Sequence, residues 1–264
     1  MNILDKIVAH KKIEIAEAKK RVSTQELENQ PYFSRKGLSL KNALQSFGII
    51  SEFKRKSPSK GIINDNVKPE IVTADYVRAG AAGLSVLTDN AFFGGSFEDF
   101  ALARLANPNT PMLRKDFMVD EYQLFEAKAI GADVILLIAA CLTPSEVKSL
   151  GKLAHELGLE VLLEVHDEYE LETALCEYVD MVGVNNRNLK TFVTSIETSV
   201  KLVENIPNNL VKISESGLKD AETIIKLQNV GYQGFLIGES FMQTPNPGNS
   251  LQKLMNELLI LPRI

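Results

Sequence analysis

From Gly48 onward, short apolar runs rich in β-branched residues alternate regularly with longer amphipathic segments. Adjacent apolar runs are centred roughly 20 to 35 residues apart, which is enough chain for one crossover helix between parallel strands. No long polar linker interrupts the series. We therefore predict eight strands, at residues 49–54, 84–88, 111–115, 134–140, 160–165, 181–186, 211–216 and 234–240.

The segments between these runs carry helix signals. Pro69 opens one segment, and Ser96 is an N-cap candidate for another that stops before Pro108. Four other segments place acidic residues early, as the helix dipole favours, and several of them finish at glycine, as the C-cap favours. Those segments are residues 120–132, 143–158, 167–178 and 218–231.

Eight strand–helix units in series favour an α/β fold of the (β/α)8 TIM-barrel type, built from residues 48–264 as a single domain that carries the active site. Residues 1–47 precede the first strand and are predicted to form a helical extension that covers one barrel end. An open, doubly wound sheet is the competing architecture. It is disfavoured because no G-x-G-x-x-G turn follows the first strand.

Composition excludes several classes of protein. The net charge is −5, and the cations are dispersed along the chain, which argues against a nucleic-acid binder. Cys141 and Cys176 have no metal-ligand spacing around them, so neither a disulfide framework nor a metal site is expected. Nothing in the sequence calls for a cofactor.

The first twenty residues mix aliphatic and charged residues at nearly every turn, which indicates an amphipathic helix and not a signal peptide. No apolar run approaches membrane-spanning length, so we expect no membrane partner and a cytoplasmic protein. The residues do not decide the oligomeric state, for which a monomer is the working hypothesis.

Polar residues gather at one end of the predicted strands. In a barrel of this type, functional side chains come from the C-terminal strand ends and the loops that follow. Each polar residue taken singly is better explained by a structural or solvated role, but their recurrence at the same end of five strands favours a shared site. These residues are Glu52, Lys54, Lys115, Asp116, Glu164, Asn185, Asn186, Arg187, Glu215 and Ser216.

Period-two alternation predicts which of these side chains point into the barrel. Glu52 and Lys54 share one face of the first strand, and an inward charged pair is costly unless it has a role. The alternative is a surface edge strand with solvated cations. Lys115 has the parity of Leu113, and Glu164 has that of Leu162 and Glu160, whereas either Glu215 or Ser216 could face inward.

Glycines mark a candidate phosphate site in two adjacent loops. Gly217 follows the seventh strand and Gly238 ends the eighth, so backbone N–H groups would be accessible without side-chain obstruction. Ser57 and Lys56 of the first loop could close this site, because the first and eighth strands are neighbours in a closed barrel. The alternative is that these glycines only form tight turns.

Two further features concern aromatic rings and histidines. Phe92 and Phe93 precede two glycines in the loop after the second strand, where they could pack over a planar ligand or simply anchor the loop. His10, His155 and His166 have no paired acid or nucleophile nearby in sequence, which favours solvated roles.

Taken in order, these motifs resemble the indole-3-glycerol-phosphate synthase family, a group of barrel enzymes of tryptophan biosynthesis. The resemblance spans nearly all of residues 48–242, and EFKRKSPS and LRKDF are its specific signals. The matching pieces are SEFKRKSPSKG (51–61), LTDNAFFGGS (87–96), LRKDFMVDEYQ (113–123), LLEVHDEYE (162–170), GVNNRNL (183–189), ISESGL (213–218) and LIGESFM (236–242).

The resemblance implies a decarboxylating lyase, whose substrate, 1-(2-carboxyphenylamino)-1-deoxyribulose 5-phosphate, loses carbon dioxide and water as the indole ring closes. Lys115 would be the general acid that protonates the ketone oxygen. Lys54 would meet the anthranilate carboxylate and donate a proton during dehydration, with Glu52 as its partner base. Glu164 would stabilise the developing cation. Which lysine serves which step is left open.

The resemblance also implies the binding residues. Asn185 and Ser216 would hold polar groups of the substrate as members of the catalytic set, and Arg187 and Glu215 would do so as binding residues. Phe93 and Phe117 would flank the substrate ring, and Leu189 would line the same site. Ser57, Gly217 and Gly238 would bind the phosphate. Glu239 is expected to offer only its backbone N–H, with the side chain turned away, because a carboxylate beside phosphate is repulsive.

The same residues are compatible with two rival functions. A Schiff-base phosphosugar aldolase needs a lysine with a pKa lowered toward neutrality, which costs about 1.4 kcal/mol for each pKa unit. Nearby carboxylates raise the pKa of a lysine and therefore oppose this change. A non-catalytic phosphosugar-binding barrel is the second rival. Such a barrel would have no catalytic activity, so a Lys115→Ala substitution could remove none.

Overall fold

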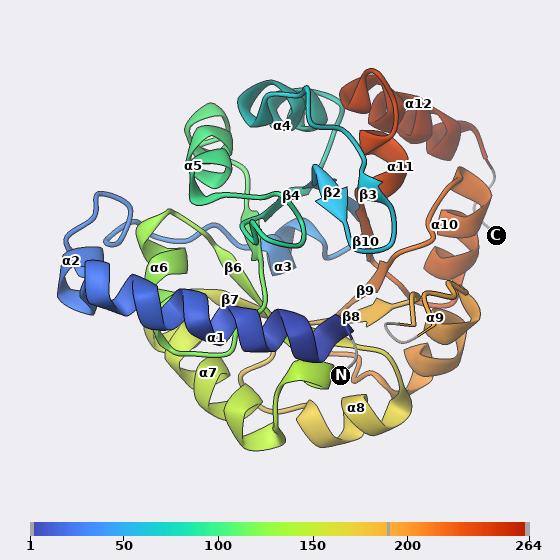
Figure 1. Ribbon diagram of the computed structural model, residues 1–264. Coiled ribbons are helices and arrows are strands. Elements are labelled where there is room, and N and C mark those ends of the chain that lie inside the picture. The colour runs from blue at the N-terminus through green and yellow to red at the C-terminus, as the bar shows by residue number, and fades with distance from the viewer. Residues whose placement is uncertain (1–2, 189–190, 262–264) are drawn as a thin grey trace.

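Eight parallel strands form a closed barrel in the computed structural model, which describes residues 3–188 and 191–261 (Figure 1). The barrel closes because β1 pairs with both β4 and β10. The predicted (β/α)8 fold is confirmed, and the open sheet is excluded. The strands are β1 Gly48–Phe53, β4 Gly83–Leu87, β5 Met112–Lys115, β6 Val134–Ile138, β7 Glu160–Val165, β8 Met181–Asn185, β9 Val211–Glu215 and β10 Gly234–Ile237.

Helices surround the barrel and begin where the sequence provides caps. The side chain of Ser96 accepts a hydrogen bond from the backbone N–H of Asp99, as its N-cap position predicts, and Thr143 forms a capping box with Glu146. The outer helices are α4 Pro69–Arg78, α5 Phe97–Ala106, α6 Tyr122–Ala129, α7 Pro144–Glu156, α8 Glu168–Ala174, α9 Glu197–Leu202, α10 Ala221–Asn229, α11 Glu239–Met242 and α12 Pro247–Ile260, with short 3₁₀ turns η1 Ala139–Cys141 and η2 Val203–Asn205.

Two predicted strands end two or three residues earlier than the sequence suggests, and four others end one residue earlier. β6 stops at Ile138 and the chain turns into η1, and β10 stops at Ile237, so that Gly238 becomes the N-cap residue of α11. Apolar or small residues continue past both strand ends, which is why the pattern overran them. The first loop also forms a short hairpin, β2 Lys56–Ser57 with β3 Gly61–Ile62, which the local sequence does not predict.

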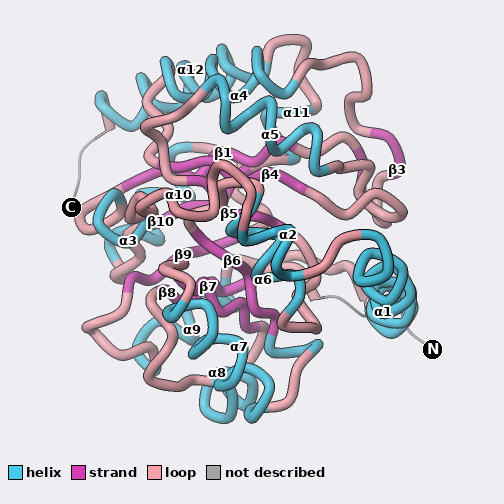
Figure 2. The backbone as a smooth tube through the Cα atoms, turned by 90° about the vertical axis from the view of Figure 1, so that its left-hand side faces the viewer, coloured by secondary structure: helices cyan, strands magenta, loops and turns pink. Residues whose placement is uncertain are grey.

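The segment before β1 reaches both ends of the barrel, and not only one end as predicted from the sequence. Its helices are α1 Ile3–Arg21, α2 Thr24–Glu28 and α3 Leu40–Ala43. Figure 2 shows α1 and α3 at opposite ends of the strands. Leu40 and Leu44 plug the N-terminal end, where a Cβ on Gly83 would lie 2.4 Å from Leu40. Ile3 and Ile7 face the cavity at the other end.

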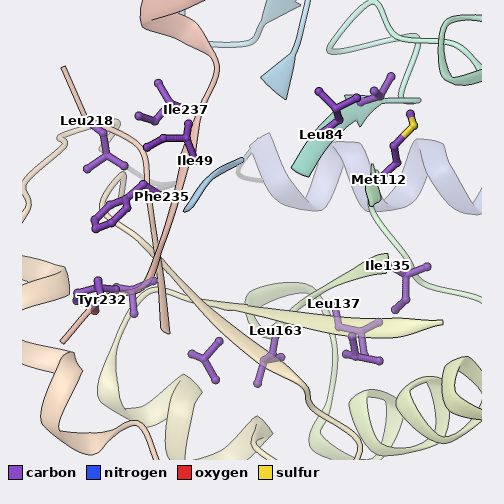
Figure 3. Close-up of a cluster of buried hydrophobic side chains, with 14 of the residues drawn as sticks. Ile49, Leu84, Met112, Ile135, Leu137, Leu163, Leu218, Tyr232, Phe235 and Ile237 are labelled. Carbon is purple, nitrogen blue, oxygen red and sulfur yellow. The ribbon is translucent and has the colours of Figure 1, made fainter. Parts of the chain in front are cut away.

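Buried side chains form two layers on either side of the strands. The inner layer fills the barrel with alternate strand residues such as Ile50, Leu113 and Leu162. The outer layer packs between strands and helices, and Figure 3 shows part of it, including Ile49, Leu84 and Leu163. Neighbouring residues on a strand thus belong to opposite layers. Polar side chains of the inner layer must therefore emerge at the barrel ends.

Within the described residues, no helix combines the length and the apolar character that crossing a bilayer requires.

Candidate active site

A cavity of about 150 Å³ lies at the C-terminal end of the barrel. Strand alternation delivers charged side chains to it from β1, β5, β7 and β9, and Ile3, Leu4 and Ile7 of α1 add an apolar wall. All six residues predicted as catalytic lie around this cavity, together with most of the predicted binding residues. They are Glu52, Lys54, Lys115, Glu164, Asn185 and Ser216, with Ser57, Phe93, Phe117, Arg187 and Glu215.

The Lys115 ammonium lies between two buried carboxylates. Its Nζ is 2.9 Å from Glu164 Oε2 and 2.8 Å from Glu215 Oε2. Burial alone would lower the pKa of Lys115, yet these carboxylates and Glu52 raise it well above its usual value. An ammonium has three donors, and two are accounted for here. The third is available to an oxygen atom in the cavity.

Glu164 and Glu215 share this lysine, but their pKa values shift in opposite directions. Burial favours the neutral acid in both, but Lys115, His166 and Asn185 lower the pKa of Glu164 to about 2. Burial raises the pKa of Glu215 to about 7, helped by the charge of Glu164. The difference has a geometric cause, because Glu164 Oε1 accepts from Asn185 at 3.0 Å whereas Glu215 Oε1 has no hydrogen-bond partner among the described residues.

Lys54 and Glu52 form a second pair from β1 and its loop. Their charged atoms are 2.7 Å apart, and Ser85 donates to the other Glu52 oxygen at 3.3 Å. Phe53, between them, packs in the outer layer, so the predicted alternation is confirmed. The edge-strand alternative is wrong, because β1 is paired on both sides.

Between Glu215 and Ser216, the strand ends and the chain turns. Glu215 is the inward residue, at 2% exposed, while Ser216 has a φ of +70° and begins the turn into Gly217, which has a φ of +75°. The Ser216 carbonyl accepts a hydrogen bond from Asn186, which holds this turn against the end of β8. Gly217 is therefore needed for its backbone conformation.

A second, wider cavity of about 870 Å³ adjoins the first and shares Lys54, Arg187 and Ser216 with it. Gly217, Gly238 and Glu239 line this second cavity, whereas Ser57 lines the first. Lys56 borders neither; its ammonium donates to the carbonyl of Ala91. The glycine at position 238 also makes room for Glu52, because a Cβ there would lie 2.7 Å from that side chain.

The Glu239 side chain corrects the sequence-based expectation. It was expected to turn away, but its Oε2 accepts from Arg187 Nη2 at 3.0 Å and its Oε1 lies 3.9 Å from Lys60 Nζ. Two cations attract the carboxylate across the cavity, and their attraction explains its position. Arg187 also donates to Ser59 Oγ at 3.1 Å.

His166 is a second correction. It was expected to be solvated, but its side chain is only 12% exposed and lies between two carboxylates, with Nδ1 at 3.1 Å from Glu170 and Nε2 at 3.5 Å from Glu164. Glu170 comes four residues later, at the start of α8, which brings it back over the strand end. The four-residue spacing between His166 and Glu170 is the sequence feature that could have predicted this contact.

Leu189, which was predicted to line the site, lies outside the described residues.

A family model described as indole-3-glycerol phosphate synthase matches residues 4–254. The chain belongs to this synthase family. A curated synthase from Bacteroides thetaiotaomicron is 47% identical over 97% of this chain and 99% of its own length. One from Salinibacter ruber is 41% identical over 97% of this chain and 96% of its own length.

Solved structures agree on the barrel. The 3-hexulose-6-phosphate synthase from Salmonella typhimurium superposes with a TM-score of 0.64 over 81% of this chain and 99% of its own, at 13% identity. The thiamine phosphate pyrophosphorylase from Pyrococcus furiosus gives 0.60 over 84% of this chain and 98% of its own, at 14% identity. At such identities the likeness shows the fold alone.

The described residues contain no group of three or more His, Cys, Asp or Glu side chains arranged to hold a metal ion. The side chains that converge are instead ammonium, carboxylate and amide groups. Such groups can donate protons and balance developing charge.

Glu215 predicts a pH-dependent effect on the stability of this synthase. Its pKa rises from a usual value of 4.5 to about 7, so folding favours its neutral form. The stabilisation that neutral Glu215 contributes to the folded state is fully present below pH 4.5 and is lost as pH rises through 7. Glu215→Gln should therefore stabilise the protein relative to wild type by an amount that grows between pH 5 and pH 8, up to about 3 kcal/mol. Urea unfolding at both pH values measures it.

Proposed function

We propose that this chain catalyses the decarboxylating and dehydrating ring closure of 1-(2-carboxyphenylamino)-1-deoxyribulose 5-phosphate to indole-3-glycerol phosphate, using the residues around the two cavities. The observation that carries the assignment is the Lys115 ammonium, held by Glu164 and Glu215 with one donor directed to neither. A protonated lysine in an enclosed, apolar-walled site is suited to protonate a carbonyl oxygen during attack by a carbon nucleophile.

The first step forms a bond between the aromatic ring and the ketone carbon of the substrate. In our assignment, Lys115 gives its proton to the ketone oxygen, which becomes a hydroxyl group. The ring and its nitrogen acquire positive charge, and the ionised Glu164, whose pKa is about 2, stabilises that charge. Loss of carbon dioxide returns the bonding electrons to the ring and removes the charge.

Dehydration follows. Lys54 lies on the same cavity and is paired with Glu52 at 2.7 Å, so it is our candidate to meet the substrate carboxylate and then to protonate the departing hydroxyl group. Glu52 is the candidate base that removes a proton from the ring carbon next to the nitrogen, so that water leaves and the ring double bond forms. The rings of Phe93 and Phe117 lie 5.9 Å apart at the cavity wall and would flank the planar ring of the substrate.

The wider cavity is our candidate for the phosphate end of the substrate. Arg187 and Lys60 supply positive charge, and the backbones at Gly217 and Gly238 line it without side-chain obstruction. The Glu239 carboxylate lies near both cations, so a bound phosphate would have to displace this carboxylate or share the two cations with it. We propose no cofactor or metal, a cytoplasmic location and a monomer.

A Schiff-base aldolase is disfavoured on physical grounds. Its lysine must be neutral to attack a carbonyl. The carboxylates around Lys115 raise its pKa, which favours the opposite protonation state. The proposed chemistry needs that protonated state.

One experiment tests the proposed reaction directly. The chain contains no Trp, so mixing purified protein with the substrate should produce indole emission without tryptophan background. We expect equal rates with and without a chelator, since the sequence provides no metal-ligand motif. We also expect no covalent lysine adduct after borohydride reduction. Absence of emission would reject the proposed reaction, and a trapped adduct would favour the aldolase.

A further inference from the structure

A lysine of the N-terminal helix is buried at the mouth of the barrel. Lys11 of α1 is only 5% exposed, and its Nζ lies 3.0 Å from Asp89 Oδ2 and 3.0 Å from Asp116 Oδ1, with Glu14 at 2.6 Å. Figure 1 shows α1 crossing in front of the strands. The three chemical steps assigned above make no use of this lysine, and burying it has a cost.

The two aspartates come from neighbouring loops that carry the aromatic wall of the cavity. Asp89 follows β4, and its Oδ1 accepts backbone hydrogen bonds from Phe92 at 2.8 Å and Phe93 at 3.1 Å. Asp116 follows β5, and its Oδ1 accepts from the backbone N–H of Phe117 at 2.8 Å. Each carboxylate therefore fixes the backbone that places one ring.

Lys11 joins these two loops. Asp89 Oδ2 has no hydrogen-bond partner in the described part of the chain and faces Lys11 as its ion-pair partner. Asp116 has further partners in Thr88 and Arg114, so Asp89 depends more on the lysine. Burial would lower the pKa of Lys11, yet the surrounding carboxylates raise it, so the lysine is charged at neutral pH.

We propose that Lys11 is a positioning residue for the reaction: through Asp89 and Asp116 it sets the spacing and orientation of Phe93 and Phe117, and thereby places the substrate ring against Lys115. This inference rests on the proposed function, in which the two rings flank that part of the substrate. A helix outside the eight strand–helix units thus determines the geometry of the catalytic site. Loss of orientation alone can reduce a rate by about 100-fold.

The test compares Lys11→Met with Lys12→Met, its exposed neighbour on α1. We expect Lys11→Met to lower kcat/KM by about 10- to 100-fold and to weaken binding of anthranilate, a probe for the ring end of the substrate, about 10-fold. Binding of inorganic phosphate should change less than about 2-fold, and Lys11→Arg should restore most of the loss. Lys12→Met should match wild type.

Two milder variants keep the inference testable if Lys11→Met folds poorly. Lys11→Met with Asp89→Asn removes one charge of each sign, and Asp89→Asn alone retains an oxygen that accepts from Phe92 and Phe93. Both should weaken anthranilate binding more than phosphate binding. If folded variants keep wild-type kcat/KM and anthranilate affinity, or if their affinities for anthranilate and inorganic phosphate fall equally, Lys11 only stabilises the fold. If wild type forms no indole product, the proposed function fails, and the anthranilate comparison still tests the positioning role.

Discussion

Replacing Lys115 with alanine should lower kcat by about 100- to 10,000-fold, because the proposed general acid is removed. The substitution also leaves Glu164 and Glu215 without the cation that lies 2.9 and 2.8 Å from them. Lys115→Met retains most of the volume and should be equally inactive. Indole emission under saturating substrate measures the loss.

Lys212 provides the matched control for this prediction. It is also a lysine on a barrel strand, but it faces outward near the N-terminal end of β9, and its Nζ donates to the carbonyl of Val203 at 2.8 Å. Lys212→Met should change stability and leave kcat near wild type. Substantial turnover by a folded Lys115→Ala protein would reject the assigned role of Lys115.

Glu164→Gln should lower kcat by about 100- to 1,000-fold, the range seen when one preorganised electrostatic group is removed from an active site. Glutamine still offers an oxygen to Asn185, which donates to Glu164 at 3.0 Å, so the local hydrogen bond survives. What disappears is the negative charge beside the developing cation. Steady-state kinetics should show a loss mainly in kcat, since the charge matters most in the transition state.

Glu160 is a control from the same strand and the same face. It lies at the opposite end of β7, where it accepts hydrogen bonds from Ser39 Oγ at 2.5 Å and the backbone N–H of Lys41 at 3.0 Å. Glu160→Gln should leave kcat within about 2-fold of wild type, because a group that touches no substrate changes no transition-state interaction. Equal losses in both variants would mean that distortion of β7, not charge, reduces the rate.

The sequence predicted the barrel because each of its units is local. Apolar runs of strand length, helix caps such as Ser96 and the spacing between runs all act over short stretches, and together they admit few topologies. Strand alternation also predicted correctly that Glu52, Lys54, Lys115 and Glu164 point into one cavity. The errors lay at strand ends, where Gly238 reads like a continuation of β10 and is instead the N-cap of α11.

Contacts between distant segments could not be predicted in this way. The partners of Glu239 come from two other loops, Arg187 and Lys60, so its orientation is set by charges that the local sequence does not contain. The pKa difference between Glu164 and Glu215 has the same origin. It depends on which carboxylate also lies near His166 and receives a hydrogen bond from Asn185.

The amino-acid sequence by itself determined the eightfold repeat, the inward face of each strand and the charged residues at one end, because these follow from periodicity and local backbone preference. Only the tertiary structure decided that α1 closes the catalytic end through Lys11 while α3 plugs the other. That arrangement depends on ion pairs and packing between residues about 80 to 100 positions apart, such as Lys11 with Asp89 and Asp116, and such pairings form only when the barrel brings the loops together.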